Sequence, residues 1–237
     1  MNIVGLSAIT AEYIQHCGSD NMVIKAARVS MGKDEITIKP DETQLIKDLV
    51  TKKHLTPFEM CDITFLIVCP IFVVRQFHRH RTLSYNEWSA SYSVVGESFY
   101  IPKELRLNPE KYKPGDRLDA DKEKELISLL EYECYKAIEG YCKLLSNGVS
   151  KEMARMILPQ NMMTKFYAKG NVRNWVQYCA VRCNKQVLYE HQILARQIFK
   201  EILKMFPISV WALAKDMFDK ETFISLNIEN TMKVKVK

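Results

Sequence analysis

Glycine is scarce in this chain of 237 residues, which contains only eight, and no two of them stand in a Gly-x-Gly arrangement. The glycine fingerprint of dinucleotide-binding folds is therefore missing, and so is the GxxxxGK[ST] loop that cradles phosphates. A protein with this sequence that binds a dinucleotide must hold it by another route, with side-chain cations and helix ends.

Long apolar runs and paired cysteines are also missing. No run reaches the roughly 18 apolar residues of a membrane span, and Met1–Val4 has neither the basic nor the apolar region of a signal peptide. The seven cysteines form no CxxC pair, which predicts free thiols in a reducing cytoplasm. Most sit in apolar surroundings, which favours core packing over nucleophilic catalysis. Cys183 leaves that role open, because Arg182 beside it could lower its pKa.

The overall composition is that of a soluble globular protein, with 47% hydrophobic and 26% charged residues. We expect one domain over residues 1–237, with a solvated tail at about 230–237. The formal net charge of +6 fits three interpretations: a mildly basic surface, a nucleic-acid-binding face, or a site for phosphorylated small molecules.

Apolar spacing of helical period dominates the chain. A strand is predicted at 62–69, a long functional loop at 82–100 and an irregular connector at 102–118. The fold class expected is α+β, a single domain with a small sheet and long helices. The predicted helices cover residues 21–30, 41–53, 71–80, 121–146, 151–158, 171–183 and 186–205, the last one stopping before Pro207.

The segment Arg79–Ser89 carries an unusual density of polar function directly after an apolar run. It combines cationic, hydroxyl, amide and carboxylate groups, which favours a site that holds an anion and a heterocycle together. Arg75 and Arg79 would share one face of a helix over 71–80. Arg155 lies among apolar neighbours, where an arginine is usually paired or reserved for an anionic ligand.

A metal site at His78, His80 and Glu87 is not expected. Flanking arginines crowd the two histidines with positive charge, which repels a divalent cation, and no further ligand pair of suitable spacing exists. The helix predicted at 171–183 has arginine and amide side chains recurring among apolar ones. That pattern fits a solvated amphipathic face or a cationic binding face, and the residues alone leave both open.

The chain resembles the flavin-dependent thymidylate synthases. Residues 79–92 match the family pattern RHRxxSxNExSxRY at every defined position except one. Further blocks in the family's order are Ala26–Ser30, His54–Glu59, Pro70–Gln76, Ala154–Pro159 and Asn171–Arg182. Ordered blocks over most of the chain make the resemblance far more specific than one short motif.

The resemblance implies a reaction and a fold. Its reaction is the reductive methylation of dUMP at C5 to give dTMP, with methylenetetrahydrofolate as carbon donor and FAD, reduced by NADPH, as hydride donor. The implied fold is α+β, with a small, mainly antiparallel sheet flanked by long helices. Family members are homotetramers whose sites are built from several subunits, and we expect the same here, with no membrane and no nucleic acid as partner.

Residue by residue, the resemblance also implies site roles. Arg182 would stabilise charge on the uracil, Ser89 would position it, and His54 would sit at the folate and nicotinamide face of the flavin. The dUMP pocket would be lined by Gln76, Arg79, Glu87, Trp88, Ser89, Ala90, Ser91, Arg155 and Arg182. FAD would be held by Ser30, Thr56, Glu59, Arg79, His80, Arg81, Asn171, Arg173, Gln177 and Gln186.

Three positions depart from the family. Ser91 stands where the pattern has a nucleotide-binding arginine, and losing a charge-assisted hydrogen bond costs about 1.5–3 kcal/mol. We expect compensation within an intact dUMP site. Gln186 replaces a histidine of some members, and Gln177 an asparagine; both keep hydrogen-bonding capacity.

Two rival functions stay open. One is a flavin-dependent C5-methylase or hydroxymethylase of another uridine nucleotide, which Ser91 supports. The other is a nucleic-acid-binding protein that uses the arginines of 75–81 on phosphates and aromatic rings for stacking.

Overall fold

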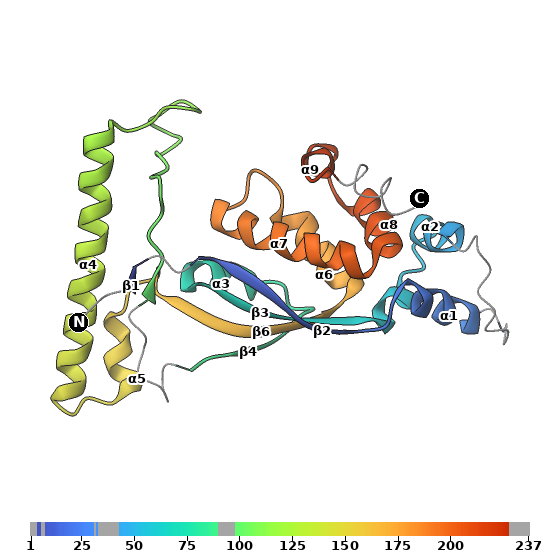
Figure 1. Ribbon diagram of the computed structural model, residues 1–237, viewed down its shortest axis with the longest axis horizontal. Coiled ribbons are helices and arrows are strands. Elements are labelled where there is room, and N and C mark those ends of the chain that lie inside the picture. The colour runs from blue at the N-terminus through green and yellow to red at the C-terminus, as the bar shows by residue number, and fades with distance from the viewer. Residues whose placement is uncertain (1–3, 6–7, 31, 33–42, 90–97, 228–237) are drawn as a thin grey trace. The chain divides into compact units, whose positions relative to one another are not determined.

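The computed structural model describes residues 4–5, 8–30, 32, 43–89 and 98–227. Contacts within the chain divide it into two compact units. The first comprises residues 1–8, 69–75 and 87–165, and the second 9–68, 76–86 and 166–237. Helices and a small sheet make up both the second unit and the chain as a whole, so the α+β class expected from the sequence is confirmed (Figure 1).

The main sheet has four strands in the order β2-β3-β6-β4. Their bounds are Thr10–Cys17 (β2), Asp62–Pro70 (β3), Met163–Asn171 (β6) and Ser84–Glu87 (β4). Strand β2 pairs antiparallel with β3, from Thr10 opposite Val68 to Cys17 opposite Asp62, with an irregularity between Tyr13 and Gln15.

The outer edge of β2 is closed by a side chain. Gln197 of helix α7 (Tyr189–Met205) accepts a hydrogen bond from the backbone N–H of Ala11 at 3.0 Å and donates one to the carbonyl of Ile9 at 2.9 Å. An amide side chain thus takes the place that a further strand would take, which protects the exposed edge from pairing with another chain.

The core of the second unit forms where helices lie over one face of the sheet (Figure 1). In β3, Ile63, Phe65 and Ile67 are fully buried while the alternate residues are half-buried, the period expected of a strand with one face in a core. Helix α6 (Val172–Arg182) contributes Trp175, whose ring lies edge-on to Phe65 and whose Nε1–H donates to the carbonyl of Ile63 at 3.0 Å.

Shorter helices complete this unit: α1 (Asp20–Ser30), α2 (Thr43–Thr51), η1 (Thr56–Met60), α8 (Pro207–Met217) and α9 (Lys220–Ser225). Buried Asp20 joins α1 to α8, because its carboxylate accepts the backbone N–H groups of Ile208 and Ser209, both at 2.9 Å. A carboxylate at a helix N-terminus satisfies free N–H groups and opposes the positive end of the helix dipole.

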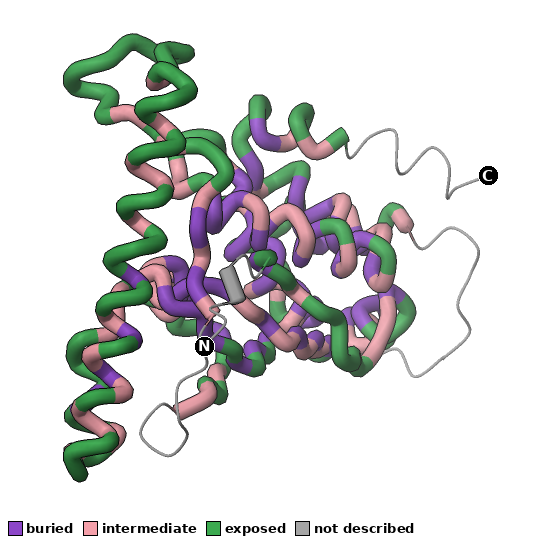
Figure 2. Tube along the Cα trace, turned by 60° about the vertical axis from the view of Figure 1, so that its left-hand side comes forward, coloured by how far each residue is buried: buried purple, intermediate pink, exposed green. Residues whose placement is uncertain are grey.

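The first unit is built around the 27-residue helix α4 (Ala120–Ser146). Asp119 caps its start by accepting the N–H of Asp121 at 3.0 Å. Most of α4 is exposed, as the long helix in Figure 2 shows, and Cys134, Ile138 and Tyr141 face the core of the unit. The remaining elements are β1 (Val4–Gly5), which pairs parallel with β5 (Ser98–Phe99), α5 (Lys151–Ala154) and η2 (Arg155–Ile157).

Several predicted boundaries need correction. The helix expected over 71–80 is α3 (Ile71–Phe77), so Arg79 lies in the turn beyond it and the shared helix face with Arg75 is wrong. The helix expected over 151–158 is split into α5 and η2. Strands β1, β2, β4, β5 and β6, the short helix η1 and helices α8 and α9 were not predicted. The loop expected over 82–100 contains strands β4 and β5. None of the described helices has the length and apolar character needed to cross a membrane.

Candidate functional site

The arginine-rich turn after α3 is held in shape by backbone and tyrosine hydrogen bonds. The N–H of His80 donates to the carbonyl of Phe77 at 3.0 Å, and that of Leu83 to the carbonyl of His80 at 3.2 Å. The hydroxyl of Tyr85 in β4 donates to these same two carbonyls, at 3.1 and 2.7 Å. The turn therefore presents Arg79 and Arg81 as exposed side chains on a fixed backbone.

Arg182, at the C-terminal end of α6, is bound by one hydrogen bond to this turn and by two to Gln76 in the last turn of α3. Its Nε–H donates to Nε2 of His80 at 2.9 Å, and its two terminal nitrogens donate to the side-chain oxygen (3.2 Å) and the backbone carbonyl (2.9 Å) of Gln76. A guanidinium has five N–H groups, so two are left to meet a ligand. The sequence grouped Gln76 and Arg182 in one pocket, and the structure brings them together.

His80 acts here as a hydrogen-bond acceptor. Burial, and then the neighbouring charge of Arg182, lower its pKa to about 4. The ring is therefore neutral at physiological pH, and because Nε2 accepts from Arg182, the proton lies on Nδ1. The sequence placed His80 among the flavin-binding residues; the structure shows that it also orients Arg182.

Aromatic side chains pack against His80 and against one another. The ring of Tyr178 lies edge-on to His80 with centroids 4.9 Å apart, and its hydroxyl is 2.9 Å from Nε2 of buried His191. Phe77 stacks parallel to His191, with 5.7 Å between centroids. Burial, and then the positive charge of Arg182, lower the pKa of His191 to about 3, so this ring is also neutral.

A second cluster lies at the start of α6. Asn171 caps the helix by accepting the N–H of Asn174 at 2.9 Å, and Arg173 forms a half-exposed ion pair with Glu59 of η1. The backbone N–H of Val172 donates to the carbonyl of Cys61 at 3.0 Å, which fixes the helix start beside η1. Three of the residues expected to hold FAD are thus brought together.

The other residues expected near the flavin lie on α1, around η1, on α6 and in the turn that follows it. Ser30 ends α1 and donates to the carbonyl of Ala27 at 2.7 Å. His54 and Thr56 are exposed around the start of η1, and Gln177 is exposed on α6. The backbone N–H of Gln186 donates to the side chain of Asn184 at 2.8 Å in the turn that follows α6.

The rest of the expected nucleotide set belongs to the first unit. Glu87 accepts a hydrogen bond from buried Thr164 at 2.9 Å, and the backbone N–H of Trp88 donates to the carbonyl of Lys165 at 3.0 Å. Arg155 is exposed, and its Nε–H donates to the carbonyl of Glu152 at 3.3 Å. Ser89 is half-buried, whereas Ala90 and Ser91 lie outside the described residues.

Thiol and metal chemistry find little support in the described chain. Burial raises the pKa of the Cys61 thiol to about 11, and it also raises the pKa values of Cys69, Cys134 and Cys179, which keeps these thiols protonated. Among the described residues, no group of three or more histidine, cysteine, aspartate or glutamate side chains is placed to hold a metal ion.

Four supporting residues were not singled out from the sequence: Tyr85, Thr164, Tyr178 and His191. Tyr178 and His191 are fully buried helix residues, and neither lies in a motif that would distinguish it from a core residue. Tyr85 falls inside the segment 79–89 and could have been found by asking which side chain satisfies the carbonyls of the turn.

Comparisons with known proteins agree on one family. The family profile described as "Thymidylate synthase complementing protein" matches residues 12–208. A flavin-dependent thymidylate synthase of Wolbachia pipientis wMel is 38% identical over 200 residues, covering 83% of this chain and 70% of the relative. One from Thermus thermophilus is 35% identical over 212 residues, covering 90% of this chain and 77% of the relative.

Two solved structures are also similar to this chain in both fold and sequence. The UMP/dUMP methylase PolB from Streptomyces cacaoi bound with 5-Br UMP superposes with a TM-score of 0.80 at 32% identity, covering 91% of this chain and 97% of that one. The same methylase bound with 5-Br dUMP gives a TM-score of 0.79 at 33% identity, covering 89% and 96%.

Proposed function

The chain belongs to the family of flavin-dependent thymidylate synthases, and from this premise we propose that it converts dUMP to dTMP by reductive methylation at C5. The observation that carries this proposal is Arg182, a cation held by Gln76 and His80 with two N–H groups to spare. A fixed positive charge stabilises negative charge that develops on the pyrimidine, and a preorganised donor needs no reorganisation during the reaction.

The residues present fit a flavin nucleotide. Arg79 and Arg81 are exposed, and within the described part of the chain neither forms an ion pair with a carboxylate, so both are free for phosphate oxygens. Asn171, Arg173 and Glu59 add amide, cationic and carboxylate groups at one helix start. FAD bound there would accept a hydride from NADPH and pass it on, and methylenetetrahydrofolate would give the carbon.

Each group of this chain would have a defined task. Arg182 would hold the uracil edge, and the neutral His80 would keep the guanidinium in place. Glu87, fixed by Thr164, would accept a hydrogen bond from the nucleotide. Arg155 and Arg79 would hold the phosphate, Ser89 would position the base, and His54 would lie at the folate and nicotinamide face.

We also propose a homotetramer in the cytoplasm. The first unit exposes large apolar side chains: Tyr132 and Tyr135, three residues apart on α4, and Met156 on η2. Exposed apolar side chains of this kind are common in protein interfaces. Light scattering on a gel-filtration column tests the assembly: a tetramer mass is expected, and Tyr132→Glu with Met156→Glu should lower it, whereas a monomer in the unaltered protein would contradict the proposal.

The first test is spectroscopic. The protein is incubated with FAD and desalted, and NADPH is then added without oxygen, with and without dUMP. We expect retained flavin absorption that bleaches faster when dUMP is present, and dTMP as product when the folate is added. Arg182→Lys should keep the flavin but lose turnover, whereas Arg117→Lys, an exposed control, should change neither. A colourless protein would refute the proposal and favour the nucleic-acid interpretation.

A second substrate is supported by two observations. PolB, which has a similar structure, is a UMP/dUMP methylase, and in this chain Ser91 replaces the arginine of the family pattern. We therefore propose that UMP is the alternative substrate. Methylation of UMP and dUMP in competition gives the ratio of their kcat/KM values, and Ser91→Arg tests its origin. A modest change in dUMP affinity is expected if other residues compensate; a reversal of nucleotide preference would mean that Ser91 sets the substrate.

A further inference from the structure

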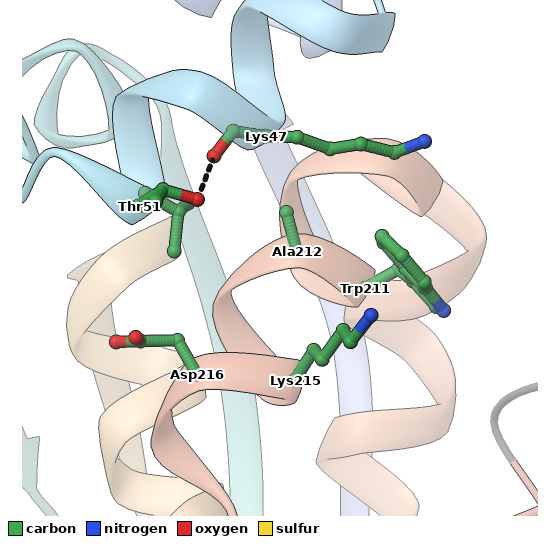
Figure 3. Close-up of a pocket in the computed structure, with 7 residues that line it drawn as sticks. Lys47, Thr51, Trp211, Ala212, Lys215 and Asp216 are labelled. Carbon is green, nitrogen blue, oxygen red and sulfur yellow. Dashed lines mark hydrogen bonds between the residues drawn. The ribbon is translucent and has the colours of Figure 1, made fainter.

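A cavity of about 390 Å³ lies between α2 and α8 in the second unit (Figure 3). This volume falls within the range of small-molecule sites in proteins. Its buried apolar lining comes from Val50 and Ala212, and its polar lining from Lys47, Thr51, Lys215 and Asp216, with Trp211 between them. None of these described residues belongs to the nucleotide or flavin sets. Two packed helices carry all of them, so the cavity is preformed.

The charges around this cavity are unbalanced. Lys47 from α2 and Lys215 from α8 each place Nζ 5.3 Å from the centroid of the Trp211 ring. Figure 3 shows both ammonium groups on the Trp211 side of the cavity and the carboxylate of Asp216 on the opposite side. That carboxylate is already bound by Lys53, at 2.6 and 2.7 Å. Within the described part of the chain, neither Lys47 nor Lys215 forms an ion pair.

We propose that this cavity, the Lys47–Trp211–Lys215 pocket, binds a small anion that carries a phosphate group. Both ammonium groups lie beside one ring, each 5.3 Å from its centroid, and a dianion bound beside that ring would interact with both positive charges. A phosphate neutralises the pair, whereas a single carboxylate leaves one positive charge. Ammonium groups are compact donors suited to phosphate oxygens, and the organic part of the ligand would cover the apolar lining and the indole.

The pocket is joined to the segment that leads into η1. Thr51 ends α2, and Lys53, which adopts a left-handed backbone with φ of 58°, reaches Asp216 immediately before His54. An anion that bridges α2 and α8 would therefore hold together the two helices that anchor this segment. Binding to the folded state alone raises the thermal midpoint.

Trp211 itself gives the readout. Protein carrying FAD and one equivalent of dUMP per chain, with no excess nucleotide, is titrated with inorganic phosphate and with ribose 5-phosphate. Ionic strength is held constant with sodium chloride, and tryptophan emission and the thermal midpoint are followed. We expect a saturable emission change that Trp211→Phe abolishes. Lys47→Gln and Lys215→Gln should each weaken binding about tenfold, whereas Lys200→Gln, an exposed control on α7, should not.

The outcomes separate the alternatives. Tighter binding of ribose 5-phosphate than of phosphate means that the organic part is recognised, and equal binding means that the site takes the free ion; both support the proposal. A response that sodium chloride reproduces, or that survives both lysine substitutions, overturns it. Stronger competition by a short single-stranded DNA also overturns it, in favour of nucleic-acid binding. Because the test measures anion binding while dUMP occupies the nucleotide site, its result does not depend on whether the protein synthesises dTMP.

Discussion

Arg182 and His80 share a hydrogen bond of 2.9 Å, from Nε of the guanidinium to Nε2 of the imidazole, and this bond exists only while His80 is unprotonated. The positive charge of Arg182 itself helps to keep His80 neutral, since it lowers the pKa of that ring. Arg182 therefore helps to keep His80 neutral, and neutral His80 fixes the orientation of the Arg182 guanidinium. A cation fixed in this way has its position set before a nucleotide arrives.

Replacing His80 by phenylalanine tests its orienting role. The Nε–H of Arg182 would lose its acceptor in a half-buried place, at a cost of about 1–3 kcal/mol. We expect kcat for dTMP synthesis to fall by about one to two orders of magnitude, with His80→Gln recovering much of it because an amide oxygen can accept the same hydrogen bond. If flavin affinity falls while kcat at saturating FAD is unchanged, His80 only holds the flavin.

Acidification should destabilise the protein through half-buried His80 and buried His191, which are both neutral. Both folded-state pKa values are lowered from 6.5, to about 4 for His80 and about 3 for His191. The unfolded chain therefore binds more protons below pH 6.5, and the free energy of unfolding falls as the pH drops from about 6.5 towards 4. Denaturant midpoints between pH 7 and 4.5 measure this slope. His191→Gln should flatten it, and an unchanged slope in this variant would contradict the assignment.

Regular patterns made much of the fold predictable. Strand β3 was found from its apolar run, and α4 from helical spacing over most of its 27 residues. Strand β6 was missed although Phe166, Ala168 and Gly170 alternate with exposed residues, because alanine and glycine are weak strand formers. Pro207 was taken as a stop, yet it is the first residue of α8, a position where proline is favoured.

The residues of the candidate site could be predicted from the sequence, but the contacts between them could not. The density of polar groups at 79–89 marks a site, and the family pattern added Arg182 and Gln76 to it. That Nε of Arg182 would point at His80 depends on how α6 packs over the turn, which no local pattern encodes. His191 carries no signal at all, since it is a single histidine among apolar helix positions whose role comes from Tyr178 and Phe77 beside it.

The hydrogen bonds between Asp20 and the start of α8 should contribute measurably to the free energy of unfolding. Asp20→Ala would leave the N–H groups of Ile208 and Ser209 without their acceptor in a buried place. Loss of a helix cap lowers the free energy of unfolding by about 0.5–2 kcal/mol, and we expect the upper half of that range because both N–H groups are affected. Asp20→Asn should lose less, and Asp121→Ala, in the exposed first turn of α4, should lose little. Guanidinium titration compares the three variants.

Substitutions at Gly170 and Leu83 should have non-additive effects on the free energy of unfolding. A Cβ atom added to Gly170 would come within 2.2 Å of Cδ2 of Leu83, so Gly170→Ala must displace the side chain of this buried leucine, which lies two residues after Arg81. We expect a loss of about 1–3 kcal/mol in the free energy of unfolding and weaker FAD retention. Leu83→Ala in the same chain removes the clash, so the double variant should lose less than the two single variants predict together. Additive losses would show that the glycine is required by its own backbone and not by the leucine it faces.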